Sequence, residues 1–96
     1  VEVVDDGEVV ERETVDDPLE SVRRFHARFR SPDIPGLPRF TGGLVGYFGY
    51  DTVRYIEPKL GEAPHDDPLA TPDILLMVSD EVLVFDKMKG RLYVVL

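Results

Sequence analysis

The chain has 96 residues, 43% of them hydrophobic, and a formal net charge of −8 at pH 7. This length and composition suit one small folded domain and argue against disorder, while the acidic balance argues against nucleic acid as a partner, because Lys and Arg must neutralise phosphates there. The absence of cysteine excludes disulfides and thiolate metal sites, and no apolar run approaches the roughly 20 residues of a membrane helix, so we expect no membrane partner and a cytoplasmic location.

The first fifteen residues predict a β-hairpin. Val1–Val4 and Glu8–Val15 are runs with strand propensity, and Asp5-Asp6-Gly7 lies between them. Asp-Gly between two extended runs is a strong hairpin signal. The second run is polar enough that we expect one of its faces to lie in water.

An amphipathic helix is predicted from Pro18 to Phe29 or Arg30. Asp17 is the expected N-cap, and Pro18 suits the first helical position. Helical spacing places Leu19, Val22, Phe25, His26 and Phe29 on one apolar stripe. We therefore expect His26 to be half-buried in the core. The four arginines between 23 and 30 are expected on a solvated face that complements the helix dipole.

The centre of the chain reads LPRFTGGLVGYFGYD at residues 37–51. Its four glycines match neither the dinucleotide-binding nor the P-loop spacing, and no Lys or Arg lies between Arg39 and Arg54 to meet a phosphate. We interpret the stretch as a buried strand that passes close to another backbone. Residues 31–41 and 58–72 are proline-rich connections, and Asp51–Glu57 is expected to form one helical turn.

The last third of the chain is predicted to be β-structure. Ile74–Val78 and Val82–Phe85 are apolar on both alternating faces, which indicates strands covered on both sides. Ser79–Glu81 interrupts them as a tight turn or a bulge. Asp86–Gly90 is a hairpin loop, after which Arg91–Leu96 returns antiparallel. The predicted fold class is α+β, a mainly antiparallel sheet with one amphipathic helix packed on it.

No residue carries a convincing signal for chemistry. His65-Asp66-Asp67 lies in a proline-rich loop, and hard-metal sites usually recruit ligands from several elements. The acidic pairs Asp5-Asp6, Asp16-Asp17 and Asp80-Glu81 fall at expected turns, where Asp is favoured for local reasons. No Ser or Thr has the context of an activated nucleophile. We predict no catalytic, cofactor-binding or metal-binding residue among these 96 positions.

The order of the signals nevertheless resembles one enzyme family. The 37–51 stretch is followed by Arg54 and Glu57, then by Pro72-Asp73, and then by the strand Val82–Asp86. This series, over most of residues 16–96, is similar to the N-terminal domain of anthranilate synthase component I and its relative aminodeoxychorismate synthase component I. The resemblance implies that residues 1–96 are part of that domain, within a larger β-sandwich-type α+β enzyme.

The resemblance also implies what lies elsewhere in such an enzyme. Anthranilate synthase, a lyase of tryptophan biosynthesis, converts chorismate to anthranilate and pyruvate with ammonia from a glutamine amidotransferase partner, component II. In the family a C-terminal domain binds chorismate and Mg²⁺, and the tryptophan effector uses a segment that would precede Val1. No catalytic or effector residue can be carried onto this sequence, so we expect the segment alone to be inactive.

Three hypotheses follow. The chain begins and ends within predicted strands, which favours a piece of anthranilate synthase component I with neighbours on both sides. The same-family alternative is aminodeoxychorismate synthase of folate synthesis. A free-standing, non-enzymatic binding module is the alternative from another class, and it predicts a compact monomer that melts cooperatively.

Overall fold

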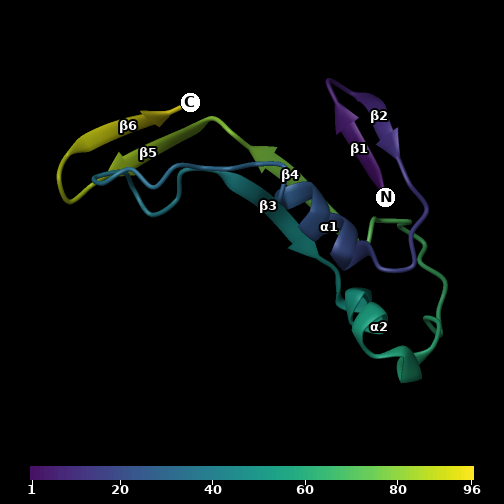
Figure 1. The fold of residues 1–96 in the computed structure, drawn as a ribbon. Helices are drawn as coiled ribbons and strands as arrows, with labels where there is room; N and C mark the ends of the chain where they lie inside the picture. Colours follow the sequence, from purple (N-terminus) through teal and green to yellow (C-terminus); the bar gives the residue numbers. More distant parts are fainter.

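A computed structural model describes residues 1–96, in which strands and two short helices follow one another along the chain (Figure 1). Strands and helices follow in the order β1 (Glu2–Asp5), β2 (Glu8–Arg12), α1 (Pro18–His26), β3 (Gly43–Phe48), α2 (Val53–Ile56), β4 (Ile74–Ser79), β5 (Val82–Asp86) and β6 (Arg91–Val95). Two single 3₁₀ turns, Tyr50–Thr52 and Pro58–Leu60, flank α2. The predicted α+β class is confirmed at this level, and neither helix is long or apolar enough to cross a membrane.

The strands form three separate antiparallel pairs where one sheet was predicted. β1 pairs with β2, β3 with β4, and β5 with β6. Of the two alternatives predicted for the interruption after β4, the tight hairpin turn is wrong, because the chain only bends at Glu81 and β4 does not pair with β5. The two apolar strands therefore run on into different ladders, along the elongated shape seen in Figure 1.

The N-terminal hairpin is confirmed. Its turn places Asp6 and Gly7 at positive φ, 47° and 82°, as an Asp-Gly turn requires. The second strand ends at Arg12, earlier than the predicted Val15. The reason is the length of its partner: Arg12 already pairs with Glu2, and only Val1 is left to bond with Glu13.

Helix α1 begins where the sequence indicated and ends early. The Asp17 carboxylate accepts hydrogen bonds from the backbone N–H groups of Leu19 at 3.0 Å and Glu20 at 3.2 Å. The helix ends at His26, and residues 27–29 continue only as a turn. His26 is exposed, so the expectation of a half-buried core histidine was wrong; of the predicted stripe, Leu19, Val22 and Phe25 are partly covered.

The chain has no hydrophobic core of its own. Only Ser21 and Thr52 are buried, and no hydrophobic residue is. Leu75 in β4 is 51% exposed and Phe85 in β5 is 72% exposed, so the prediction of strands covered on both sides is wrong for the chain as it stands. The radius of gyration is 17.3 Å, against about 13 Å for a compact domain near 100 residues.

Gly46 of β3 and Gly49 just after it meet backbone, as predicted, whereas a Cβ on Gly43 would meet nothing within 4 Å. A Cβ on Gly46 would collide with the carbonyl oxygen of Leu75 in β4, and one on Gly49 would lie 3.0 Å from the carbonyl oxygen of Asp73. Close backbone approach is therefore confirmed. The same strand is not buried, since Val45, Tyr47 and Phe48 are all exposed.

Candidate functional site

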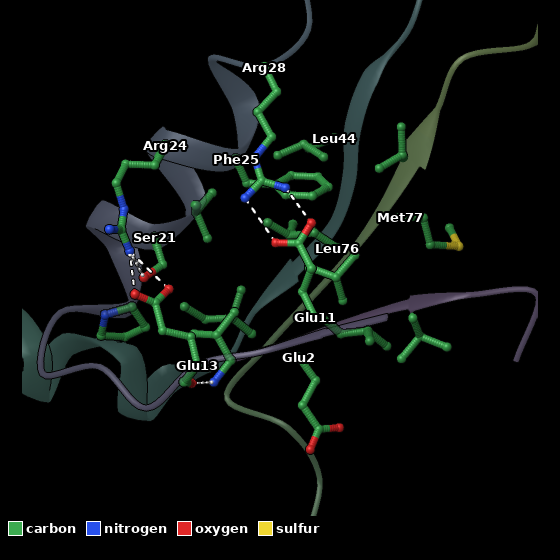
Figure 2. A pocket seen from close by; sticks show the side chains of 18 of the residues that line it. Glu2, Glu11, Glu13, Ser21, Arg24, Phe25, Arg28, Leu44, Leu76 and Met77 are labelled. Carbon is green, nitrogen blue, oxygen red and sulfur yellow. Dashed lines mark hydrogen bonds and ion pairs between the residues drawn. The ribbon is translucent and has the colours of Figure 1, made fainter. Parts of the chain in front are cut away.

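A hollow with a volume of about 1300 Å³ lies between the β1–β2 hairpin, helix α1 and the β3–β4 pair (Figure 2). Apolar side chains from α1 and the two strands line much of it, among them Val22, Phe25, Leu44 and Leu76. Glutamates of the hairpin and arginines of α1 and the turn after it face one another across its side. This hollow is the candidate site.

One ion pair crosses the hollow between Glu11 of β2 and Arg28. The guanidinium donates to both carboxylate oxygens, at 2.6 Å and 2.9 Å, a bidentate geometry that is stronger than a single bond. The hydrogen bond from Arg28 lowers the pKa of Glu11, and the bond to Glu11 raises the pKa of Arg28. Arg28 also lies over the Phe25 ring, 5.1 Å from its centroid, which adds a cation–π contact.

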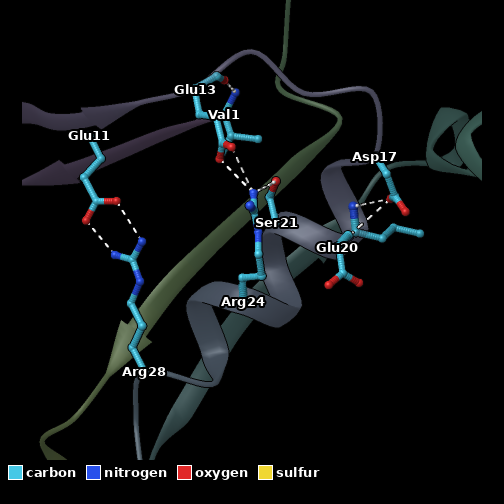
Figure 3. A network of polar contacts seen from close by, with 9 residues as sticks. Val1, Glu11, Glu13, Asp17, Glu20, Ser21, Arg24 and Arg28 are labelled. Atoms are coloured by element: carbon cyan, nitrogen blue, oxygen red, sulfur yellow. Dashed lines mark hydrogen bonds and ion pairs between the residues drawn. The ribbon is translucent and has the colours of Figure 1, made fainter.

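A second ion pair joins Arg24 of α1 to Glu13, just after β2 (Figure 3). Nη2 of Arg24 lies 3.0 Å from each carboxylate oxygen of Glu13 and 3.2 Å from Oγ of Ser21. Ser21 is only 7% exposed, so this contact sits at the best-covered point of the helix. Glu13 also pairs with Val1 through the backbone, which closes the base of the hairpin.

Charged groups at the hollow are paired with one another in two arginine–glutamate ion pairs. Each of the two arginines already faces a glutamate, so neither is offered to an anionic substrate. The residues that line the hollow include no histidine or cysteine, and their one serine, Ser21, contacts Arg24 and no general base. Their one tyrosine, Tyr55, donates its proton in a hydrogen bond to Asp73, which raises the pKa of the phenol and so disfavours the phenolate. The arrangement holds two parts of the chain together and presents no activated group.

A second polar cluster fastens the 37–51 stretch to the start of β4. The carbonyl oxygen of Asp73 accepts from the Gly49 N–H at 2.6 Å and from Oγ1 of Thr52 at 3.3 Å. The Asp73 carboxylate accepts from the Tyr55 hydroxyl at 3.0 Å, and the Tyr47 hydroxyl donates to the carbonyl of Pro72 at 2.9 Å. The hydrogen bond to the Asp73 carboxylate raises the pKa of Tyr55, because it favours the protonated phenol that donates the bond.

Arg54 anchors the long loop that follows α2, a role that the sequence reading missed. Its Nε donates to Asp51 at 2.7 Å, and its Nη1 donates to the carbonyls of Leu60, Gly61 and Glu62 at 3.0–3.2 Å. The Asp51–Arg54 spacing of three residues in a predicted helical turn is a signal that could have indicated the ion pair. The three carbonyl contacts have no sequence signal.

The weak metal candidates are not brought together. His26 lies at the end of α1 and His65 in the 58–72 loop, both exposed. Asp67 accepts from the backbone N–H groups of Leu69 and Thr71, which is the turn role expected for Asp. No three His, Asp or Glu side chains lie close enough to share a metal ion.

These features define a small α+β fold whose elements are joined by two ion pairs and by the cluster around Asp73. Comparison with known proteins shows what it is similar to: the chain is homologous to anthranilate synthase component 1 over nearly its whole length. It is 57% identical over 95 residues to the Pseudomonas putida protein, covering 99% of this chain and 19% of the relative. It is also 57% identical to the Pseudomonas aeruginosa protein over 90 residues, which cover 94% of this chain and 18% of the relative. It is 49% identical to a Neisseria meningitidis protein over 98 residues, which cover 99% of this chain and 20% of the relative.

The chain thus spans about a fifth of the length of the curated relatives it matches. No protein-family model matches it, and no solved structure does. The resemblance read from the 37–51 stretch is confirmed.

Proposed function

We propose that this chain is a framework segment of the N-terminal domain of an anthranilate synthase component 1, and that it has no catalytic activity alone. The observation that carries the proposal is 57% identity, over 99% of the chain, to a protein of that name. All three relatives described above bear it, which favours anthranilate synthase over aminodeoxychorismate synthase.

The full-length protein would convert chorismate and ammonia to anthranilate and pyruvate, a step of tryptophan biosynthesis in the cytoplasm. Component II would supply the ammonia from glutamine. Chorismate, Mg²⁺ and the tryptophan effector would bind mainly to residues outside this segment. The lack of a gathered carboxylate cluster here supports that assignment for the metal.

The surface of the chain supports a framework role. It exposes 8610 Å², about 3000 Å² more than the roughly 5500 Å² expected for a compact monomer of 10.8 kDa. Permanent interfaces bury areas of this order. Much of the excess is apolar, including Leu83 and Phe85 of β5 and Leu92 and Val94 of β6. A free-standing binding module would bury such residues itself.

The activity is tested on the full-length protein. We expect chorismate, ammonium and Mg²⁺ to yield fluorescent anthranilate with one pyruvate per turnover, and we expect none from residues 1–96 alone. Aminodeoxychorismate as the product would replace the proposed enzyme with its relative. Turnover by the isolated segment would contradict the non-catalytic assignment.

The framework role is tested by a pair of matched substitutions. Phe85→Asp places a carboxylate on a β5 face that we propose to be covered in the full-length protein, where an unpaired charge is costly. Met88→Asp makes the same charge change in the adjacent hairpin loop, at a side chain that is 96% exposed. We expect the first variant to lower the melting temperature of the full-length protein by many degrees and the second to leave it unchanged. Equal melting temperatures would refute the role of this face.

A further inference from the structure

The Arg54 guanidinium is enclosed by oxygen atoms from two parts of the chain. Its Nε donates to a carboxylate oxygen of Asp51 at 2.7 Å. Its Nη1 donates to three successive backbone carbonyls, those of Leu60, Gly61 and Glu62, at 3.0–3.2 Å. The Arg54 side chain is 23% exposed, against 53–76% for the arginines of the other ion pairs. Among the paired arginines it is therefore the one that its own surroundings cover best.

The three carbonyls converge because the chain turns sharply at Gly61. Its φ of 62° and ψ of −156° lie in a region that residues with a side chain rarely adopt. The turn directs the negative ends of three carbonyl dipoles to one nitrogen atom. An amino group of a guanidinium has only two N–H groups, so three carbonyls around it are arranged as oxygens are around a cation. Converging backbone carbonyls are a common way in which proteins coordinate cations.

These contacts form within residues 51–62, so they do not depend on parts of the protein that lie outside this chain. Helix α2 supplies the arginine, and the 3₁₀ turn after it leads into the carbonyls. The backbone N–H groups of Leu60 and Gly61 donate to the carbonyls of Glu57 and Pro58, each at 3.0 Å. The turn therefore has hydrogen bonds of its own, to which Arg54 adds a positive charge at the carbonyls.

We propose that the Asp51 carboxylate and the carbonyls of residues 60–62 form a binding site for a guanidinium-type cation, which the side chain of Arg54 occupies in the intact protein. The two walls of the site bind different nitrogens of one planar group, Nε and Nη1. Such a planar fork of donors is a property of a guanidinium and not of a spherical ion. When the arginine side chain is shortened, the site takes up free guanidinium from solution.

The proposal is tested by chemical rescue of Arg54→Ala in the full-length protein. Amide hydrogen exchange at Leu60 and Gly61 reports the order of the turn, because both N–H groups are hydrogen-bonded there. We expect exchange to be about tenfold faster in the variant, since a hydrogen bond to a charged group is worth at least that factor in an opening equilibrium. Guanidinium chloride at about 50 mM, far below the molar concentrations that unfold proteins, should return exchange toward the parent rate with a saturating dose dependence.

The matched control is Arg23→Ala, which removes the same charge. Arg23 also pairs with an acid three residues away, Glu20 at 2.9 Å, and its hydrogen bond goes to that carboxylate alone. We expect exchange at residues 60 and 61 to be unchanged in this control, with or without guanidinium. Sodium chloride at the same concentration should leave Arg54→Ala unprotected. Equal protection by sodium chloride, absence of rescue, or exchange as slow in Arg54→Ala as in the parent would each overturn the proposal.

Arg54→Lys keeps the test decisive if Arg54→Ala fails to fold. Lysine carries its donors on one nitrogen, so it binds Asp51 or the carbonyls and does not span both. We expect faster exchange at Leu60 and Gly61 than in the parent, and equal exchange would overturn the guanidinium site. The measurement does not depend on turnover, so its failure leaves the proposed enzyme function standing, and absence of anthranilate formation leaves the site standing.

Discussion

Gly46 in β3 is the position where one methyl group should do most harm. A Cβ built there overlaps the carbonyl oxygen of Leu75 and lies 2.9 Å from both the carbonyl carbon of Leu75 and the Cα of Leu76. These are backbone atoms of the paired strand β4, so no side chain can rotate away to make room. Gly46→Ala must therefore push the two strands apart.

The size of the effect follows from that displacement. Carbon atoms prefer separations of about 3.5–4.0 Å, so β3 and β4 must separate locally by at least about half an ångström. Overpacking of this kind costs roughly 1–3 kcal/mol, and each ladder hydrogen bond that weakens forfeits part of roughly 0.5–1.5 kcal/mol. Alanine restricts the unfolded chain and returns about 0.4–1 kcal/mol. We expect a net loss of about 2 kcal/mol.

Thermal unfolding of the full-length protein measures this loss. At about 2–4 °C per kcal/mol for domains of 150–250 residues, the melting temperature of Gly46→Ala should fall by roughly 4–8 °C. Gly49→Ala is the graded comparison, because its Cβ would lie 3.0 Å from the Asp73 carbonyl oxygen and needs a smaller shift. A Gly46→Ala protein as stable as the parent, or more stable than Gly49→Ala, would refute the argument from close backbone approach.

Further predictions concern the polar contacts. The raised pKa of Tyr55 means that its bond to Asp73 stabilises the fold fully below the ordinary tyrosine pKa, and that this stabilisation is lost as pH rises through the raised value. In Asp73→Asn, the ionisation of the last tyrosine, monitored by ultraviolet absorbance, should move to lower pH. An unchanged titration would contradict this. The lowered pKa of Glu11 means that its ion pair contributes to stability above the ordinary glutamate pKa, and that this contribution is lost as pH falls through the lowered value. In Glu11→Gln, this loss of stability at acid pH should be absent when the free energy of unfolding is measured over a pH series. A pH profile identical to the parent's would count against the pair. Asp17→Ala removes the two N-cap bonds and should destabilise the fold by about 1 kcal/mol, measured by denaturant unfolding, with Asp17→Asn as the variant that keeps the cap. Arg54→Gln should speed amide exchange and proteolytic cleavage near residues 60–62, and equal protection would show that other contacts hold the loop.

Signals between near neighbours in the sequence predicted local structure well. Asp6-Gly7 gave the hairpin turn, Asp17-Pro18 the start of α1, and Gly90 the β5–β6 turn at a φ of 61°. In each case the residue itself decides the backbone angle or supplies the capping oxygen. Such effects need no knowledge of the rest of the fold.

Signals that depend on residues far apart in the sequence did not predict the structure well. The apolar runs at residues 74–78 and 82–85 indicate burial on both faces, yet they do not say which part of a protein does the covering, and the residues of this chain leave Leu75 and Phe85 exposed. The Glu11–Arg28 pair joins residues 17 positions apart, and nothing in either neighbourhood distinguishes them from other charged residues. The pairing of β4 and β5 with different strands is likewise a tertiary outcome.

The two ends of the 58–72 loop are held by separate sets of hydrogen bonds. Arg54 binds the carbonyls at its start, and Asp73, just after its end, accepts from Gly49 and Tyr55. Between Glu62 and Asp67 no hydrogen bond ties the loop to any strand. The length of this interval is thus uncoupled from the register of β4 against β3. Residues could be inserted there, including a short tag or a protease site, without shifting the strands, since added length in a surface loop carries only a small entropic cost.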